Sequence, residues 1–232
     1  MSNNAGKKYA ANKALEFVQA DMVLGIGTGS TAKYFIDGLA EKIKTGWSLK
    51  GIATSEETDR LARAAGVEMI TPDETTIIDL AVDGADEADP ERNLIKGGGA
   101  ALLREKIVAG SARKFIVIAD ASKRVSTLGA FPLPVEIEPF GWALTVRRIR
   151  ETLSDAGYSS PSLELRAFGG AAVKTDGDNL IVDCQLGRIA DPKNLDAALN
   201  TIPGVVENGL FCGMANMVIY GDDDGVSIDG AV

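Results

Sequence analysis

The sequence of 232 residues contains no histidine. This absence excludes Ser–His and Cys–His nucleophile pairs, and it removes the side chain that most often binds transition metals. Acid–base chemistry must therefore come from aspartate, glutamate, lysine, tyrosine or cysteine. Cysteine is scarce as well. Cys184 and Cys212 are far apart and each lies in an apolar run, so we expect two reduced core thiols rather than a disulfide.

Long apolar runs and an excess of positive charge are also missing. No apolar run approaches 18 residues, and the start MSNNAGKKYA is too polar for a signal peptide. We therefore expect a soluble, cytoplasmic protein without membrane partners. The net charge of −9 argues against nucleic acid as a general partner, because binding a phosphate backbone requires a basic surface. A small anionic ligand held by a few lysines remains compatible with this charge.

Strand and helix patterns alternate through residue 125. This alternation predicts an α/β fold with a doubly wound, mostly parallel, Rossmann-like sheet. A last apolar run at residues 217–220 is expected to return to this sheet. The expected strands are residues 22–26, 51–53, 69–70, 77–82 and 114–119, and the expected helices are residues 7–18, 32–43, 55–65 and 100–109.

The pattern changes beyond Phe131. The order of elements becomes β-α-β-β-α-β, which is typical of a ferredoxin-like split unit. We therefore predict a first domain of residues 1–130 plus 212–232, and a smaller ferredoxin-like α+β domain of residues 131–211. The expected strands of the smaller domain are residues 132–139, 163–167, 180–184 and 205–211, and its helices are residues 142–156 and 194–201.

The first motif is GIGTGST at residues 25–31, between a short strand and a helix. Such a loop offers backbone N–H groups and a helix N-terminus to an anion. It is not a dinucleotide fingerprint, because Ser30 replaces the third glycine, and it lacks the lysine of a Walker A loop. The hydroxyls of Thr28, Ser30 and Thr31 suit a phosphate or carboxylate. The alternative is a tight turn whose glycines serve packing alone.

The second motif is the stretch VDGADEADPERNLIKGGGAALLREK at residues 82–106. Asp83 and Asp86 follow an apolar strand, at the edge of a parallel sheet where ligands bind. Lys96 precedes three glycines at 97–99 that let the backbone approach a ligand. In the alternative interpretation, Asp83, Asp86 and Asp89 bind Mg²⁺, although the nearby lysine makes a cation site less favourable.

Two further residues belong with this stretch. Lys123 in DASKRV follows another strand and is expected at the same edge of the sheet. Glu105 has Ala101, Leu102, Val108 and Ala109 as its three- and four-spaced neighbours, so we expect it on a buried helix face. Burial raises the pKa of a carboxylate toward the range useful for a general base. The alternative is an ordinary solvent face formed by residues 104–106.

An anion cradle beside a base and a cation suits proton abstraction next to the carbonyl of a phosphorylated substrate. Lys96 could supply the positive charge that a developing enediolate needs, without a metal ion.

The motifs GIGTGSTA, DGADE, KGGGAALLREKI and IADASK occur in an order and spacing that resemble ribose-5-phosphate isomerase of type A. FPLPVE and IPGVVENGLF extend the resemblance over nearly the whole chain. The resemblance implies interconversion of ribose 5-phosphate and ribulose 5-phosphate, a step of the pentose phosphate pathway, through a cis-enediolate. It also implies that no metal or organic cofactor takes part, and it suggests a homodimer or a tetramer.

The resemblance assigns roles to individual residues. Glu105 is the expected proton-transferring base, and Lys96 the residue that stabilises the enediolate. Asp83 and Asp86 are expected to assist ring opening and to hold sugar hydroxyls. Lys7 is a weaker candidate for the phosphate end than Lys123. The expected substrate-binding residues are Thr28, Gly29, Ser30, Thr31, Gly84, Ala85, Gly97, Gly98, Gly99, Lys123 and Lys7.

The chain departs from the family pattern at Asn216, where an aspartate is common, and at Ala53 and Thr54, where a serine pair is frequent. We expect these changes to affect packing more than activity. Two related functions stay open: a coenzyme A transferase, which would form a glutamyl thioester, and a domain that senses sugar phosphates without converting them. The presence of both Glu105 and Lys96 argues against a pure sensor.

Overall fold

The computed structural model describes residues 4–232, which form two compact units. Unit 1 comprises residues 4–85, 104–124 and 213–232, and unit 2 comprises residues 86–103 and 125–212. The predicted boundaries placed residues 86–103 in the first domain, whereas here they group with unit 2. The reason is strand pairing: β5 (Glu87–Ala88) pairs with β6 (Leu94–Ile95), and β6 pairs with β14 (Leu210–Phe211).

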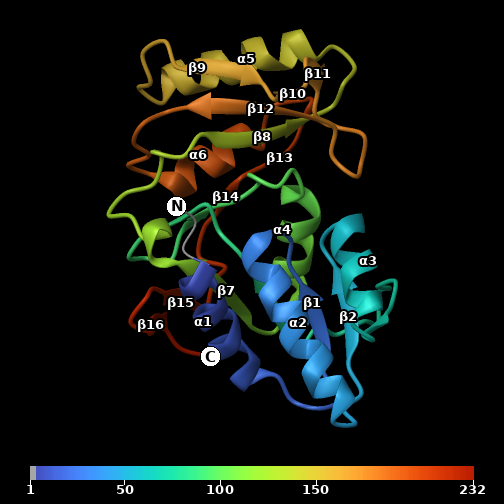
Figure 1. Cartoon of the computed structure of the whole chain (residues 1–232). Coiled ribbons are helices and arrows are strands. Elements are labelled where there is room, and N and C mark those ends of the chain that lie inside the picture. The colour runs from blue at the N-terminus through green and yellow to red at the C-terminus, as the bar shows by residue number, and fades with distance from the viewer. Residues whose placement is uncertain (1–3) are drawn as a thin grey trace. The chain divides into compact units, whose positions relative to one another are not determined.

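Unit 1 is built on a seven-stranded sheet with the order β16-β15-β7-β4-β1-β2-β3 (Figure 1). All neighbours run parallel except β16, which is antiparallel to β15. The predicted return of the last apolar run is confirmed by β15, but the pattern did not predict β16. The strands are β1 (Val23–Ile26), β2 (Lys50–Ala53), β3 (Glu68–Met69), β4 (Leu80–Asp83), β7 (Phe115–Asp120), β15 (Met217–Gly221) and β16 (Val226–Gly230).

Helices cover both faces of this sheet. Side chains that alternate along the strands, such as Ile26, Val82 and Ile118, share one core with α1, α2 and α3. The opposite face meets α4, because a Cβ atom on Gly25 would lie 2.4 Å from Val108 Cγ1. The helices are α1 (Asn4–Ala14), followed by the 3₁₀ helix η1 (Leu15–Phe17), α2 (Ser30–Lys44), α3 (Glu56–Ala64) and α4 (Leu102–Ser111). The predicted doubly wound α/β fold is confirmed.

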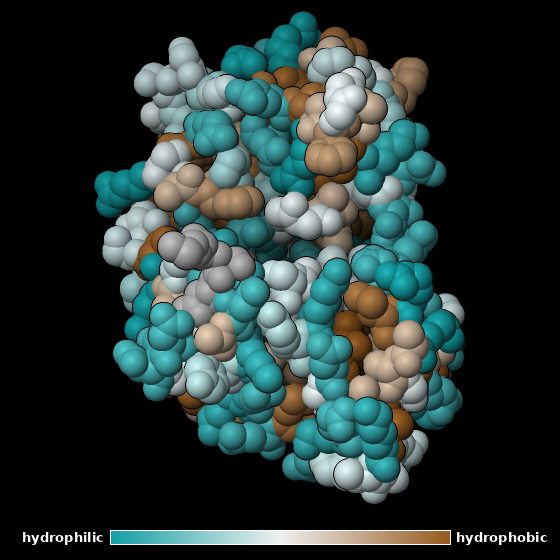
Figure 2. Space-filling view, in the orientation of Figure 1, coloured by the Kyte–Doolittle hydropathy of each residue, from teal (hydrophilic) through white to brown (hydrophobic). Residues whose placement is uncertain are grey.

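The surface of unit 1 is hydrophilic over most of the face drawn in Figure 2, with hydrophobic side chains gathered where α2 and α3 lie in Figure 1. Partly buried apolar residues of both helices pack against the core of unit 1, among them Tyr34, Ile43 and Leu61. Over residues 4–232, no helix has the length and apolar character needed to cross a membrane.

Three predicted element boundaries in unit 1 need correction. The helix expected at residues 7–18 begins at Asn4 and ends at Ala14, where η1 follows. The strand expected at residues 77–82 begins at Leu80, and Ile77 is 53% exposed. Asp79 instead accepts a hydrogen bond from the Val23 N–H at 2.9 Å. The helix expected at residues 100–109 begins at Leu102, because Ala100 has a φ of 60°, which no α-helix accommodates.

Unit 2 contains a four-stranded antiparallel sheet with the order β13-β8-β12-β9. The chain order β8-α5-β9-β12-α6-β13 is the predicted ferredoxin-like one, with additional short strands. Core side chains include Val135, Ile149 and Leu195, from the sheet and both helices. The elements are β8 (Leu133–Ile137), α5 (Trp142–Asp155), β9 (Ser162–Leu165), β12 (Leu180–Gln185), α6 (Pro192–Leu199) and β13 (Val205–Asn208).

The single strand expected at residues 205–211 is in fact two strands in different sheets. Gly209 separates β13 from β14, and its N–H donates to Pro134 O at 2.8 Å. A Cβ atom at this position would lie 2.3 Å from Lys96 O, so only glycine fits. The strand expected at residues 163–167 is also divided: β9 ends at Leu165, and Ala167 belongs to an unpredicted short hairpin of β10 (Ala167–Phe168) and β11 (Ala171–Ala172). Neither cysteine forms a disulfide, as predicted; Cys184 is buried and Cys212 is only partly so.

Candidate active site

The anion loop of unit 1 joins β1 to α2. Gly29 is the N-cap of α2 and has a φ of 112°, a conformation that favours glycine. The Lys7 ammonium, on the first turns of α1, donates to Ser30 Oγ at 2.9 Å. The weaker of the two lysine candidates therefore lies at the helix N-terminus predicted to bind an anion. An N-terminal turn together with an ammonium group is suited to a phosphate.

A cluster of hydroxyl groups holds Thr28 beside this loop. Its Oγ1 lies 2.7 Å from Thr54 Oγ1, 2.9 Å from Ser55 Oγ and 3.2 Å from Thr58 Oγ1. Ser55 is also the N-cap of α3, and Thr58 donates to Gly27 O at 3.0 Å. The sequence analysis named Thr54 only as a departure from the family pattern, expected to affect packing, yet its side chain lies in this cluster and lines the crevice with Asp83. Ser55 and Thr58 were not identified as site residues. The only signal in the sequence was the run of hydroxyl residues after the second strand.

Asp83 ends β4 and is 3% exposed. Its Oδ1 accepts hydrogen bonds from Gly84 N at 2.7 Å and Thr28 N at 3.1 Å. Gly27 makes this approach possible, because a Cβ atom there would lie 2.1 Å from Asp83 Oδ1. The glycines of the anion loop therefore serve a carboxylate of the same chain as well as the turn.

Glu105 lies on α4 and is 4% exposed, as the spacing of its apolar neighbours predicted. The alternative of a solvent face holds for Arg104 and Lys106, which are partly exposed, but not for Glu105. Arg104 lies 3.8 Å from Glu56. Glu105 and Asp83 line one narrow crevice in unit 1, together with Gly27 and Thr54. A buried carboxylate beside a second one is the arrangement that general acid–base catalysis uses.

Lys123 lies at the carboxyl end of β7, on the 3₁₀ helix η2 (Ala121–Lys123). β7 is the parallel neighbour of β4, so Lys123 and Asp83 share the predicted edge of the sheet. Asp120 caps η2 by accepting from Ser122 N at 3.1 Å. Among residues 4–232, the described hydrogen bonds do not connect Lys123 to the anion loop.

Unit 2 carries the remaining predicted residues. Gly98 N donates to Asp86 Oδ2 at 2.8 Å, and a Cβ atom on Gly98 would lie 2.6 Å from Asp86 Oδ1. Asp86 N donates to Ile95 O at 2.8 Å, which fixes the start of the stretch against β6. Gly97 has a φ of 102°, so the first glycine is required by its conformation.

Lys96 is 2% exposed. Its backbone N–H donates to Gly209 O at 2.9 Å, and its Nζ lies 5.5 Å from the centroid of the Phe211 ring. An ammonium group at this distance is attracted by the face of an aromatic ring. The fold therefore holds a buried cation directly before the glycine loop.

Asp89, the third aspartate considered for Mg²⁺, shapes a turn in unit 2. Its Oδ1 accepts from Glu91 N and from Asn93 N, both at 2.9 Å. Among residues 4–232, no three acidic or cysteine side chains are grouped so as to hold a metal ion.

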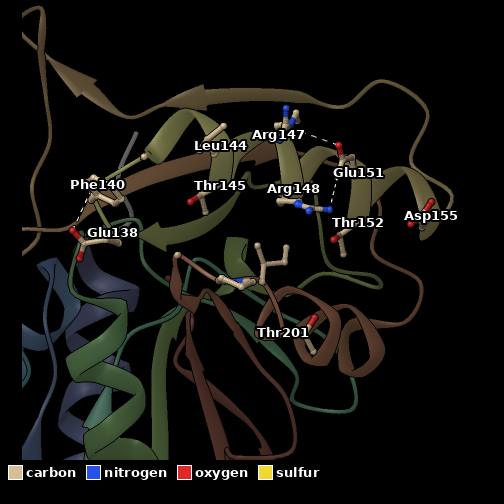
Figure 3. Close-up of a pocket in the computed structure, with 14 residues that line it drawn as sticks. Glu138, Phe140, Leu144, Thr145, Arg147, Arg148, Glu151, Thr152, Asp155 and Thr201 are labelled. Carbon is tan, nitrogen blue, oxygen red and sulfur yellow. Dashed lines mark hydrogen bonds and ion pairs between the residues drawn. The ribbon is translucent and has the colours of Figure 1, made fainter.

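A separate hollow in unit 2 lies beside α5 (Figure 3). Arg147 and Arg148 line it, and each pairs with Glu151, at 3.8 Å and 3.3 Å. None of the predicted site residues is among its lining residues. Both arginines are paired with Glu151 on the helix surface, so neither is placed to stabilise the charge of an enediolate.

The chain is similar to known proteins over nearly its whole length. A family model described as Ribose 5-phosphate isomerase A (phosphoriboisomerase A) matches residues 50–225. The ribose-5-phosphate isomerase A of Parvibaculum lavamentivorans is 52% identical over 228 residues, which cover 98% of this chain and 99% of that protein. The corresponding protein of Rhodopseudomonas palustris is 50% identical and covers 98% of both chains.

Solved structures extend the likeness to the fold. A D-ribose-5-phosphate isomerase in complex with phospho-erythronic acid matches with a TM-score of 0.92 and 42% identity, over 100% of both chains. The ribose 5-phosphate isomerase of Plasmodium falciparum matches with a TM-score of 0.93 and 34% identity, over 98% of this chain and 99% of that one. These matches confirm the resemblance inferred from the motifs.

Proposed function

The chain belongs to the ribose 5-phosphate isomerase A family, and from this membership we infer that it is an aldose–ketose isomerase for ribose 5-phosphate and ribulose 5-phosphate. One observation carries the chemistry: Glu105 is buried on α4 and lines the same crevice as Asp83. An isomerase of this kind needs such a carboxylate to move a proton between two neighbouring carbons. The transferase and sensor alternatives are not favoured by any of these similarities.

We propose the following steps for the open-chain sugar. Glu105 removes the proton from C2, and a double bond forms between C1 and C2. The negative charge on O1 is stabilised by the Lys96 ammonium, and O1 then takes up a proton. Glu105 returns its proton to C1. O2 releases its hydroxyl proton to solvent, which replaces the proton that solvent gave to O1, and O2 becomes the ketone oxygen. The proton count is the same in substrate and product.

Asp83 and Asp86 are proposed to assist ring opening and to hold the sugar hydroxyls. They are three residues apart in the chain, so their Cα atoms are at most about 11 Å apart. Both carboxylates are held by backbone N–H groups, Asp83 by Thr28 and Gly84, and Asp86 by Gly98. Backbone groups of residues 84–85 and 97–99 are proposed to face the sugar.

The phosphate end is proposed to bind the anion loop of residues 28–31. The N-terminus of α2 supplies backbone N–H groups there, and the Lys7 contact with Ser30 supports a cation at the same place. Lys123 is proposed as the second cation, since it shares the sheet edge with Asp83.

We also propose that the protein is a cytoplasmic homo-oligomer, a dimer or a tetramer. Exposed aromatic side chains on unit 2 support self-association, since Phe140 is 90% exposed beside the hollow of Figure 3. Light scattering over a range of concentrations should give a mass above that of one chain. A mass equal to one chain at every concentration would rule out the oligomer.

The direct test is proton exchange. Purified protein, treated with a chelator, is incubated with ribose 5-phosphate in deuterated water and followed by NMR. We expect ribulose 5-phosphate with deuterium on C1, because the proton held by Glu105 exchanges with solvent in the enediolate state. Binding without conversion would overturn the isomerase in favour of a sensor.

The Glu105→Gln variant tests the base itself. The amide keeps the shape of the side chain but cannot take up the proton, so kcat should fall by about a thousandfold or more. Binding of phospho-erythronic acid should survive. Glu41→Gln, an exposed glutamate on α2, is the matched control and should keep full turnover. Equal loss of binding and turnover in Glu105→Gln would make Glu105 a structural residue.

A further inference from the structure

Arg166 lies in unit 2, between β9 and β10, and its backbone N–H donates to Ile181 O at 2.8 Å. Its side chain is mostly buried, with 15% exposed. Nε donates to Asp183 Oδ2 at 2.9 Å, and Nη2 donates to Asp183 Oδ1. A guanidinium paired through two nitrogens to one carboxylate has a fixed orientation.

The third nitrogen of Arg166 points at the glycine loop. Nη1 donates to Gly97 O at 2.7 Å and lies 3.3 Å from Gly98 O. The other side of the same peptide, the N–H of Gly98, donates to Asp86. The peptide between Gly97 and Gly98 is therefore held at its carbonyl by Arg166 and at its N–H by the Asp86 carboxylate.

We propose that Arg166 is a positioning residue for the isomerisation, with Asp183 as its anchor. It acts through the Gly97–Gly98 peptide on Asp86, and through the start of the loop on Lys96. The inference rests on the proposed function, which assigns Asp86 and Lys96 to the reacting end of the sugar.

The physical reason is the freedom of the loop. Successive glycines populate many backbone conformations, so an unrestrained peptide between them can rotate. Rotation would turn the Gly97 carbonyl toward Asp86 in place of the Gly98 N–H, and the carboxylate would lose its donor and face a second acceptor. A charge-assisted hydrogen bond from a rigid guanidinium opposes this rotation.

An ion pair alone does not account for this geometry. The pair with Asp183 uses Nε and Nη2, and it does not require Nη1 to reach Gly97 O. Lysine at position 166 could pair with Asp183 but has no planar fork that reaches Asp183 and Gly97 together. Arginine is therefore required at position 166 only if the contact with Gly97 O contributes to turnover.

The test compares Arg166→Lys, Arg166→Met and Asp183→Asn with the wild type. We expect kcat for ribose 5-phosphate to fall at least about tenfold in all three variants. Competitive inhibition by inorganic phosphate should change less than about twofold, because the phosphate end lies on the anion loop of unit 1. Guanidinium ion added to Arg166→Ala should restore part of the lost turnover.

Arg150→Met is the matched control. Arg150 also donates to a backbone carbonyl of unit 2, from Nη1 to Pro161 O at 3.1 Å, but this carbonyl lies outside the glycine loop. It should lose thermal stability to a similar degree while keeping kcat.

Two results would overturn the inference: wild-type kcat in Arg166→Lys, or an equal loss of kcat in Arg150→Met. A fully active Glu105→Gln would instead refute the proposed mechanism. Inactive Glu105→Gln together with active Arg166 variants would refute the positioning role alone.

Discussion

At the scale of single residues, the carboxylates of the two aspartates of the DGAD motif are held by the same kind of contacts. Each carboxylate lies against a glycine, Asp83 against Gly27 and Asp86 against Gly98, at distances that leave no room for a Cβ atom. Each also accepts a backbone N–H, from Thr28 and from Gly98. Glycine therefore positions acidic side chains here, in addition to exposing the backbone.

The phosphate end gives a residue-scale prediction. Lys123→Ala should raise KM more than any other single lysine change and leave kcat nearly unchanged, because Lys123 is assigned to the non-reacting end of the sugar. Lys7→Ala should raise KM by a smaller factor. Steady-state kinetics with ribose 5-phosphate measures both constants.

Lys33→Ala is the matched control, since Lys33 is an exposed residue of α2 that lies 3.8 Å from Glu57. An unchanged KM in Lys123→Ala would remove this residue from the phosphate site.

The sequence predicted some residues of the site better than others. Glu105 could be predicted as buried, because its neighbours on the same helix are apolar and helix geometry is local. The hydroxyl cluster of Thr54, Ser55 and Thr58 around Thr28 was missed, since it joins the segments after two strands that only the folded sheet brings together. Asn216 was expected to affect packing, and its Oδ1 accepts from Phe115 N at 2.8 Å, at the start of β7.

At the scale of elements, α4 determines where the proposed base lies. Val108 is one turn after Glu105 and packs against Gly25 of β1. Because no side chain separates strand from helix at Gly25, α4 lies close to the sheet. Glu105 is thereby brought to the same crevice as Asp83.

This packing predicts the effect of Gly25→Ala. The new methyl group would meet Val108 Cγ1 at 2.4 Å and Ala81 Cβ at 3.0 Å, so α4 must move outward. We expect a loss of about 1–3 kcal/mol in the free energy of unfolding, and a lower kcat because Glu105 moves with the helix. Thermal unfolding and steady-state kinetics measure the two effects.

The double variant Gly25→Ala with Val108→Ala should recover part of both losses, because it removes the closer clash. Gly110→Ala is the matched control on the same helix, since the added Cβ atom would lie 3.4 Å from its nearest neighbour, Met214 Cε. If Val108→Ala gives no recovery, the contact between strand and helix does not position Glu105.

Element types were easier to predict than their ends. The apolar periodicity of α4 lies within the helix, but its first residue depends on the left-handed conformation of Ala100. The break at Gly209 depends on Lys96, more than a hundred residues earlier in the chain. Local patterns do not contain such contacts, so residues 205–211 were expected to form a single strand.

At the scale of the whole molecule, we expect alkaline pH to lower the stability of the fold through buried ionisable groups of unit 2. Burial raises the pKa of the Cys184 thiol to about 12, and burial, with Asp191 as a second cause, raises the pKa of Tyr158. A thiol in the unfolded chain ionises near pH 8.5 or so. Above that pH the unfolded state loses a proton that the folded state keeps, so the free energy of unfolding falls as the pH rises. Below that pH the full contribution of this group to stability is present.

We therefore predict a steeper loss of thermal stability for the wild type than for Cys184→Ala between about pH 8 and about pH 11. Scanning calorimetry across this range measures the slope of Tm against pH. Val182→Ala is the matched control: it truncates a buried side chain on the same strand without removing an ionisable group, so it should lower Tm but keep the wild-type slope. Equal slopes for wild type and Cys184→Ala would contradict the prediction.

The fold class was predictable because the order of strands and helices along the chain can be inferred from local sequence patterns. The division of the chain into two units was harder to predict. Residues 86–103 follow a strand of unit 1 directly, yet their two short strands pair with β14 in unit 2. No pattern inside residues 86–103 shows that their partner lies at residues 210–211.

The position of β15 has a consequence for how the protein is made. β7 is buried along its whole length and apolar up to Asp120, and in the finished sheet it lies between β4 and β15. Met217 pairs with Ile116, so the ribosome synthesises one side of β7 long before its neighbour exists. Throughout that interval β7 is an open, hydrophobic sheet edge, the kind of surface on which nascent chains aggregate. Only when residues 217–221 emerge can β15 cover this edge.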